Sequence, residues 1–177
     1  VENLNLRLAF DGRRIRIRDA SGRMGLGELS LGGWLRWSPE GELGYQLDLK
    51  GDRAPLVRTP NLLLRSDLDL TLSGGLRQPH RLSGRLDLRE SVLLMDFDPL
   101  APKTRKGPAA NPPYFSIEEE PFAGWELDLQ LAGEDFLQVR SPYFEALLSV
   151  QGNLQGTLRE PVLLARLTTR DGSVLFP

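Results

Sequence analysis

The stretch Trp125-Glu126-Leu127-Asp128-Leu129-Gln130-Leu131 alternates large apolar residues with charged or amide residues. Successive side chains of a β-strand point to opposite faces, so this stretch predicts a strand with one apolar and one polar face. The same alternation recurs at residues 4–8, 43–49, 68–72 and 86–88. The repeated apolar residue is leucine, a weaker strand former than the β-branched and aromatic residues of ordinary β-cores. The function of the chain depends on what this leucine face covers.

The length and composition indicate one globular domain. At 177 residues the chain can bury roughly 70% of its unfolded surface if compact. Hydrophobic residues make up 40% and charged residues 26%, which argues against disorder, and the 7% of aromatic residues leaves a mostly aliphatic apolar content. The net charge of -2 argues against a general nucleic-acid binder. The absence of cysteine excludes a disulfide scaffold and thiolate zinc sites.

Neither a membrane span nor a signal peptide is visible in the sequence. No apolar run approaches the roughly 18 residues that a span needs. The chain opens on Val1 instead of methionine and stops at residues 175–177 in mid-pattern. We therefore expect a single domain over residues 1–177 that is a fragment of a larger protein, with membrane anchoring outside the fragment.

Two hairpins can be predicted with their register. Asp11-Gly12 favours a two-residue type I′ turn, which would pair Phe10 with Arg13, Leu8 with Ile15 and Leu6 with Ile17. A three-residue loop at residues 39–41, with Gly41 in the left-handed region, would pair Trp37 with Leu43 and Leu35 with Tyr45.

The remaining breaks predict an all-β chain of about a dozen short strands. One strand ends at Gly51-Asp52, and Pro55 and Pro60 bracket a connecting piece. The proline-rich residues 98–121 indicate a long loop insertion. No stretch of 10 residues shows a convincing helical period with caps.

A weak internal repeat is also present. The first copy contains Leu76-Arg77-Gln78-Pro79, then a strand, then Arg89-Glu90-Ser91. The second contains Leu158-Arg159-Glu160-Pro161, then a strand, then Arg170-Asp171-Gly172. A repeated strand–turn–strand unit is typical of an elongated, stacked β architecture.

The side chains that carry catalysis are few. His80 is the only histidine and follows Pro79 in a predicted turn, so we interpret it as a solvated loop residue. Without a second histidine or a cysteine, a metal site or a Ser-His-Asp relay is disfavoured. We expect no catalytic residues, no metal and no cofactor, and therefore no enzyme.

Charged and aromatic groups have structural interpretations that we prefer. The pairs Asp67/Asp69 and Asp96/Asp98 resemble the carboxylate pairs of glycosidases, but they fit a polar sheet face balanced by Arg65, Arg85 and Arg89. Arg14, Arg16 and Arg18 form a basic strip that a phosphate headgroup or anionic partner could use, although a wet sheet surface is favoured. Trp34 and Trp37 flank a hairpin and are expected to pack.

Two long phrases of the sequence resemble the C-terminal domain of the TamB family, which is related to the AsmA-like proteins. The first is Leu70-Thr71-Leu72-Ser73-Gly74 with Pro79 and residues 82–91. The second runs from residues 125–131 and 137–140 through Val150-Gln151-Gly152-Asn153-Leu154-Gln155-Gly156 to residues 170–173. The resemblance covers about residues 62–177, and its motifs are Leu, Gly, Pro and Asp at loose spacing.

The resemblance implies an all-β fold, an elongated antiparallel or mixed sheet curled into a U-shaped hydrophobic trough. It also implies a periplasmic location in a protein anchored to the inner membrane. The implied partners are phospholipid acyl chains and, in the full-length context, a BamA-like outer-membrane protein (TamA). The implied roles are movement of phospholipid or of nascent outer-membrane proteins across the periplasm.

The residues fit a lipid-conducting trough on physical grounds. A leucine lining can bury an acyl chain at about 0.8 kcal/mol per methylene, and a chain that slides along a uniform lining exchanges equivalent contacts. The predicted lipid-binding residues are Leu43, Tyr45, Leu47, Leu49, Leu68, Leu70, Leu72, Leu86, Leu88, Trp125, Leu127, Leu129, Leu131, Phe144, Leu148 and Val150.

Two alternatives remain open. A chaperone-like scaffold would hold an unfolded outer-membrane protein by strand addition at exposed sheet edges. A closed β-sandwich would use the leucines only to fill a core.

Overall fold

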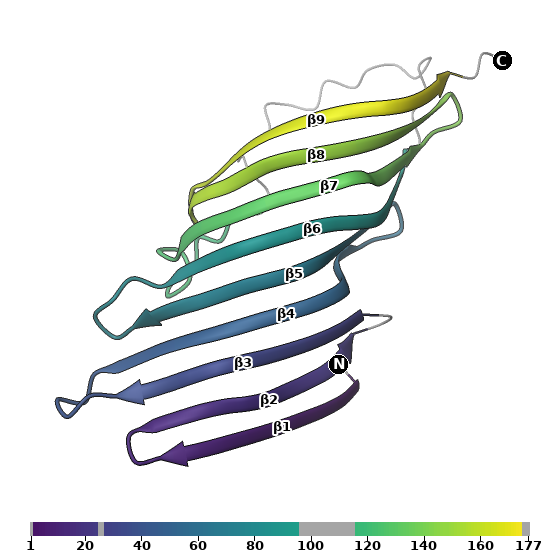
Figure 1. Ribbon diagram of the computed structural model, residues 1–177. Coiled ribbons are helices and arrows are strands. Elements are labelled where there is room, and N and C mark those ends of the chain that lie inside the picture. The colour runs from purple at the N-terminus through teal and green to yellow at the C-terminus, as the bar shows by residue number, and fades with distance from the viewer. Residues whose placement is uncertain (1, 25–26, 96–115, 175–177) are drawn as a thin grey trace.

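Nine strands form one continuous sheet in the order of the chain (Figure 1). The computed structural model describes residues 2–24, 27–95 and 116–174. Neighbouring strands are antiparallel, except that β6 and β7 are parallel. The strands are β1 Glu2–Asp11, β2 Arg14–Met24, β3 Gly27–Trp37, β4 Leu43–Arg58, β5 Leu62–Gly75, β6 Arg81–Leu94, β7 Glu126–Arg140, β8 Phe144–Thr157 and β9 Pro161–Val174.

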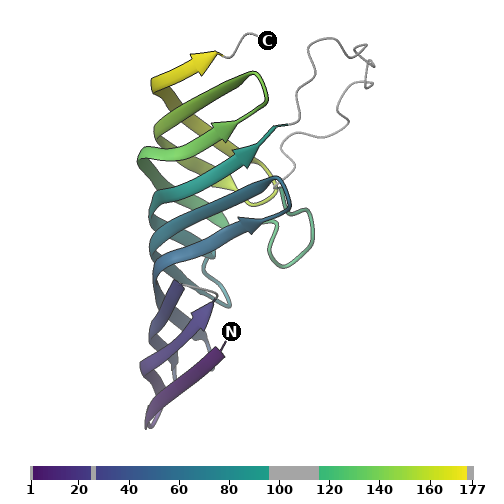
Figure 2. The same cartoon turned by 90° about the vertical axis from the view of Figure 1, so that its right-hand side faces the viewer.

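The sheet is bent into an open trough, which confirms the predicted fold class (Figure 2). Each strand turns midway along its length, so that both of its ends lie on the open side of the profile. The described residues include no helix and no second sheet that covers a face. The fold is therefore one curled layer instead of a closed sandwich.

The register places the apolar residues of successive strands on one face. Leu47 on β4 lies opposite Leu72 on β5, Leu72 lies opposite Leu82 on β6, and Leu82 lies beside Leu127 on β7. Leu127 and Leu129 are only 6% and 5% exposed, although no second sheet or helix among the described residues covers them. We conclude from this burial that the apolar face is the inner, concave one.

Three β-bulges lie where the strands bend. Arg53 on β4, Glu90 on β6 and Asp135 on β7 have φ values of 46°, 42° and 47°, and the register shifts beside each of them. An extra residue in one strand bends that strand and increases its twist. Small side chains occupy the inner corner of the bend: Ala54 and Ser66 have no exposed area, and Ser91 is 2% exposed.

The bulges correct the predicted number of strands. Strand β4 does not end at Gly51-Asp52 but continues through Pro55 to Arg58. Strand β7 likewise continues from Glu126, within the predicted strand 125–131, to Arg140 without a break. Polar and small residues occur at both bulges and turns. A bulge inside a long strand therefore looks like a turn in the sequence, and nine long strands were predicted as about a dozen short ones.

The predicted hairpin registers had different outcomes. Trp37 pairs with Leu43 and Leu35 with Tyr45, and Gly41 has φ 81°, as predicted. The first register was wrong, because Phe10 pairs with Ile15 and Leu8 with Ile17. The loop is Gly12-Arg13, which puts a glycine with φ 54° first and pairs the apolar Phe10 with another apolar residue. Of the predicted loop 98–121, residues 98–115 lie outside the described residues.

Candidate functional site

The predicted lining residues lie on the concave face, and none of them is highly exposed. Leu49, Leu70, Gly84, Leu129 and Leu154 form one row across five strands, and the other predicted residues lie in parallel rows. Trp125 precedes β7, and Phe144 begins β8, so these two are at the ends of strands. The structure thus brings the predicted residues onto one continuous surface.

The lining has a buried floor and half-buried walls. Leu68, Leu88, Leu127 and Leu129 are between 5% and 9% exposed, whereas most of the other predicted residues are of intermediate exposure. The burial of the first group stabilises the fold. The second group retains apolar surface that faces the open side of the trough, and this surface is available to a hydrocarbon guest.

The sequence prediction omitted lining residues at both ends of the sheet. On β1, Leu6, Leu8 and Phe10 are 57%, 43% and 72% exposed and continue the concave face through Ile15 and Ile17. On β9, Leu163 and Leu167 are 49% and 62% exposed and continue it through Leu154 and Val150. Their alternation was visible in the sequence, but only pairing shows that it continues the same face.

A cluster of rings lies at one lip of the trough. The Tyr45 hydroxyl and His80 Nδ1 are 2.6 Å apart, and their rings are stacked with centroids 5.7 Å apart. Trp125 lies 5.3 Å from His80 and 5.2 Å from Phe122 between ring centroids. His80 is half-buried in this cluster, so its interpretation as a solvated loop residue was wrong. Through these ring contacts, Trp125 contributes to the rim of the trough.

Burial raises the pKa of Tyr45 above its ordinary value.

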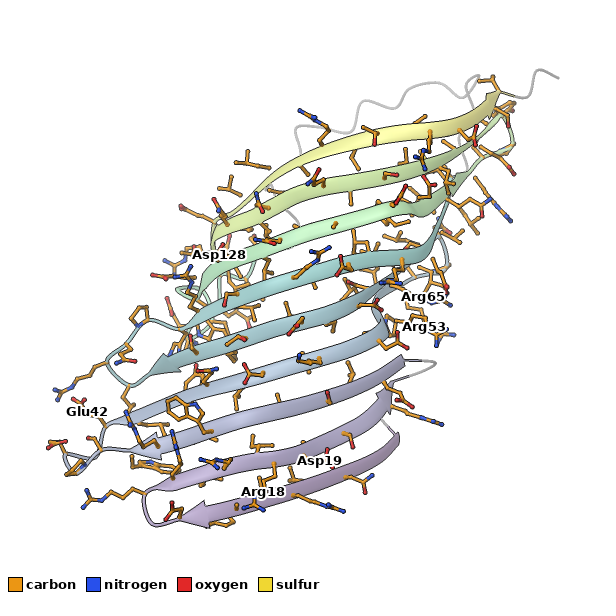
Figure 3. All side chains as sticks on the ribbon, viewed as in Figure 1. Arg18, Asp19, Glu42, Arg53, Arg65 and Asp128 are labelled. Carbon is orange, nitrogen blue, oxygen red and sulfur yellow. The ribbon has the colours of Figure 1, made fainter. Side chains whose placement is uncertain are left out.

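Charged side chains lie all along the sheet (Figure 3), and on the convex face of β5 to β7 most of them are paired. Arg81 pairs with Asp128, Arg85 with Asp87 at 2.8 Å, and Arg89 with Asp67 at 2.6 Å. The acidic pair Asp67/Asp69 is part of this pattern, since Asp69 pairs with Lys50 at 3.5 Å. The pair Asp96/Asp98 lies outside the described residues.

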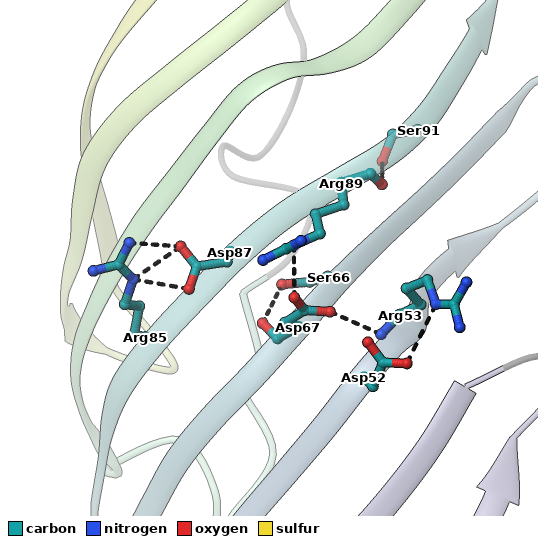
Figure 4. A network of polar contacts seen from close by, with 8 residues as sticks. All are labelled: Asp52, Arg53, Ser66, Asp67, Arg85, Asp87, Arg89 and Ser91. Carbon is teal, nitrogen blue, oxygen red and sulfur yellow. Dashed lines mark hydrogen bonds and ion pairs between the residues drawn. The ribbon is translucent and has the colours of Figure 1, made fainter.

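Part of this network satisfies the backbone at the bulges (Figure 4). The Arg53 N–H donates to Asp67 Oδ1 at 2.9 Å, and the Arg65 N–H donates to Ser91 Oγ at 3.0 Å. The Asp135 N–H donates to Ser149 Oγ at 2.8 Å in the same way. A bulge takes backbone groups out of the ladder, and these side chains on neighbouring strands supply the missing acceptors.

No group of three or more metal-ligating side chains was found among the described residues. In the same part of the chain there is no helix with the length and apolarity of a membrane span. No family model, curated protein or solved structure matches the chain. The class that the structure defines is an open β-trough with an apolar concave face, and the TamB resemblance stays a prediction.

Proposed function

We propose that this chain is a periplasmic trough segment that binds acyl chains and conducts phospholipid between the inner and outer membranes, as the TamB resemblance implies. One observation carries the proposal: a continuous leucine surface lies on the concave face of a single-layer sheet, and no second sheet or helix formed by residues 2–24, 27–95 and 116–174 seals it. Burial of an acyl chain on such a surface gains about 0.8 kcal/mol per methylene. Within the proposal, the whole protein is anchored to the inner membrane and works with a BamA-like outer-membrane partner.

Uniform lining is what a conducting surface needs. Leucines from β3 to β9 repeat along the trough in the rows that the register defines. A guest chain that moves by one strand spacing leaves a set of aliphatic contacts and meets a similar set, so the barrier to movement stays low. A deep, closed pocket would hold one ligand in one place instead.

The sharpest test compares two adjacent residues of β7 that point to opposite faces. Leu131 is half-buried on the concave face, opposite Gly152 and beside Leu86, while Gln130 is exposed on the convex face. We expect Leu131→Arg to reduce binding of a fluorescent fatty acid at least tenfold, because it places a charge among methylenes. Gln130→Arg adds the same charge outside the trough and should leave binding unchanged.

Leu131 is a better choice than Leu129 for this test. Leu129 is 5% exposed, so an arginine there would disrupt the floor of the trough and destabilise the fold. Far-UV circular dichroism and urea unfolding should first verify that both β7 variants fold. Equal fatty-acid binding by Leu131→Arg, Gln130→Arg and the unaltered chain would contradict the proposal.

The second candidate function, a scaffold for outer-membrane protein insertion, is favoured by the edge strand β9. Val162 and Leu164 are 51% and 65% exposed and lie on the convex face, opposite the polar Gln155 and Asn153. Apolar residues on both faces suit a strand that lies between two neighbours, so a further strand, of the same protein or of a guest, can pair with β9. A strand-forming peptide that slows amide hydrogen exchange in β9, with no lipid recovered in an organic extract, would favour the scaffold.

A further inference from the structure

We infer that Trp34, with Arg14 and Arg36, forms a binding site for a phosphate-bearing headgroup on the convex side of the trough. Trp34 lies on the polar face of β3, opposite Arg16 on β2 and Gln46 on β4. The guanidinium carbons of Arg14 and Arg36 are 5.2 Å and 5.7 Å from the centroid of its ring. Both distances are within the range of cation–π contacts, so the ring holds two cations side by side.

The protein leaves these two cations without anionic partners. Arg14 and Arg36 are directly opposite each other in the ladder, an arrangement in which like charges repel. No carboxylate among the described residues lies within 4.0 Å of either guanidinium, although Asp11 is opposite Arg14 on β1. On β6 of the same face, Arg81, Arg85 and Arg89 are all paired with aspartates. Arg14 Nε is also buried without an acceptor.

A hollow of about 500 Å³ lies beside this group. Its lining contains Trp34 and Arg36, but not Arg14, and combines the polar and cationic side chains of Gln46, Ser73, Arg77 and Arg81 with the carboxylates of Glu42 and Glu126. Arg77 and Arg81 are held by Glu42 and Asp128, which leaves Arg36 as the uncommitted cation in the hollow. Its size is within the usual range for small-molecule sites, and the planar fork of a guanidinium matches a phosphate.

The position of this site relative to the trough points to a lipid headgroup. On the same strands, Leu35, Trp37, Leu43 and Tyr45 face the concave side near the lip. A phospholipid at this lip would have its tails against those residues and its phosphate within reach of the arginines. The assignment of the phosphate to a lipid rests on the proposed function, whereas the recognition of phosphate by this cluster does not.

The test is flotation of the purified chain with vesicles of phosphatidylglycerol or of phosphatidylcholine. We expect the unaltered chain to float with the anionic vesicles. The double variant Arg14→Gln/Arg36→Gln should bind these vesicles at least about tenfold more weakly. The matched control is Arg58→Gln/Arg166→Gln, which removes two exposed arginines that have no ion pair among the described residues. This control should bind like the unaltered chain.

Three outcomes have defined meanings. An equal loss in both double variants overturns the site, because only net charge then matters. Displacement of the chain from vesicles by glycerol 3-phosphate, but not by potassium glutamate at equal ionic strength, supports phosphate recognition, and equal displacement by both overturns it. Fatty-acid binding separates this inference from the proposed function: Arg14→Gln/Arg36→Gln should retain it, and Leu131→Arg should lose it.

Discussion

Gly33 lies in the middle of β3 with φ 132°, on the concave face between Ile17 and Leu47. A Cβ at this position would run into the carbonyl oxygen of Gln46. Gly84 repeats the arrangement on β6: its φ is 133°, and a Cβ there would clash with the carbonyl oxygen of Asp69. Glycine inside a strand usually weakens it, but here it permits a backbone approach that no other residue allows.

Replacement of Gly33 therefore has a predictable cost. We expect Gly33→Ala to lower the free energy of unfolding by about 1–3 kcal/mol, through the positive φ and the clash with Gln46. The neighbouring Gly32→Ala is the control, because a Cβ there meets no atom within 4 Å and should be neutral or stabilise slightly. Urea unfolding measures both, and equal stabilities for the two variants would contradict the role of Gly33.

Tyr45 gives a prediction for pH. Its pKa is raised by burial, so the folded state favours the protonated phenol. A raised pKa in the folded state means that the stabilisation is complete below the unfolded value near 10 and is lost as pH rises through the folded value. At pH 8 we expect Tyr45→Phe to be less stable by about 1 kcal/mol, through loss of the 2.6 Å contact with His80.

The stability difference between the unaltered chain and Tyr45→Phe should then shrink above pH 10. Chemical denaturation at a series of pH values measures it. A difference that stays constant up to pH 11.5 (roughly 1.5 units above the ordinary tyrosine pKa) would show that Tyr45 ionises as it does in the unfolded chain.

At the scale of the strand, the bulges separate what the sequence could predict from what it could not. The alternation of apolar and polar residues predicted which side chains of β4, β5, β6 and β7 lie on the apolar face, because this depends only on the local sequence of each strand. It could not give strand length, since a bulge at Arg53 and a turn need the same polar and small residues. The repeat Arg89-Glu90-Ser91 was visible in the sequence, and the structure shows that it marks a bulge on β6.

The bulge on β4 depends on a side chain of β5, which can be tested with the acidic pair. Asp67 accepts the Arg53 N–H at 2.9 Å and pairs with Arg89 at 2.6 Å, and its side chain is 26% exposed. We expect Asp67→Ala to lower the free energy of unfolding by about 1–3 kcal/mol, because a backbone donor loses its acceptor.

Asp69→Ala is the matched control for this prediction. Asp69 is two residues along β5 on the same face, and within the described part of the chain its one ion pair is with Lys50, with both side chains 66% exposed. Its loss should change stability by less than about 0.5 kcal/mol. Equal effects of the two alanines in urea unfolding would show that the bulge does not require Asp67.

At the scale of the molecule, the described strands form one curled layer, and much of its apolar surface stays partly exposed. The sequence predicted the curled sheet through the TamB resemblance, because alternation alone is equally compatible with a closed sandwich. It could not place Arg14 and Arg36 against Trp34, since these contacts depend on the pairing of β2 with β3. Functional role, partners and location stay predictions, because no comparison tests them.

An open trough also predicts how the whole molecule responds to a guest. A ligand that binds only the folded state at 100 times its Kd stabilises it by about 2.7 kcal/mol, and for a chain of this size roughly 2–4 °C of Tm accompanies each kcal/mol. We therefore expect a long-chain fatty acid to raise the Tm by about 5–10 °C in a concentration-dependent manner. Leu131→Arg should abolish the shift while Gln130→Arg keeps it, since only Leu131 faces the trough. If the fatty acid leaves the Tm of all three proteins unchanged, the half-buried leucines contact only one another. The single layer would then be a structural scaffold without a lipid path.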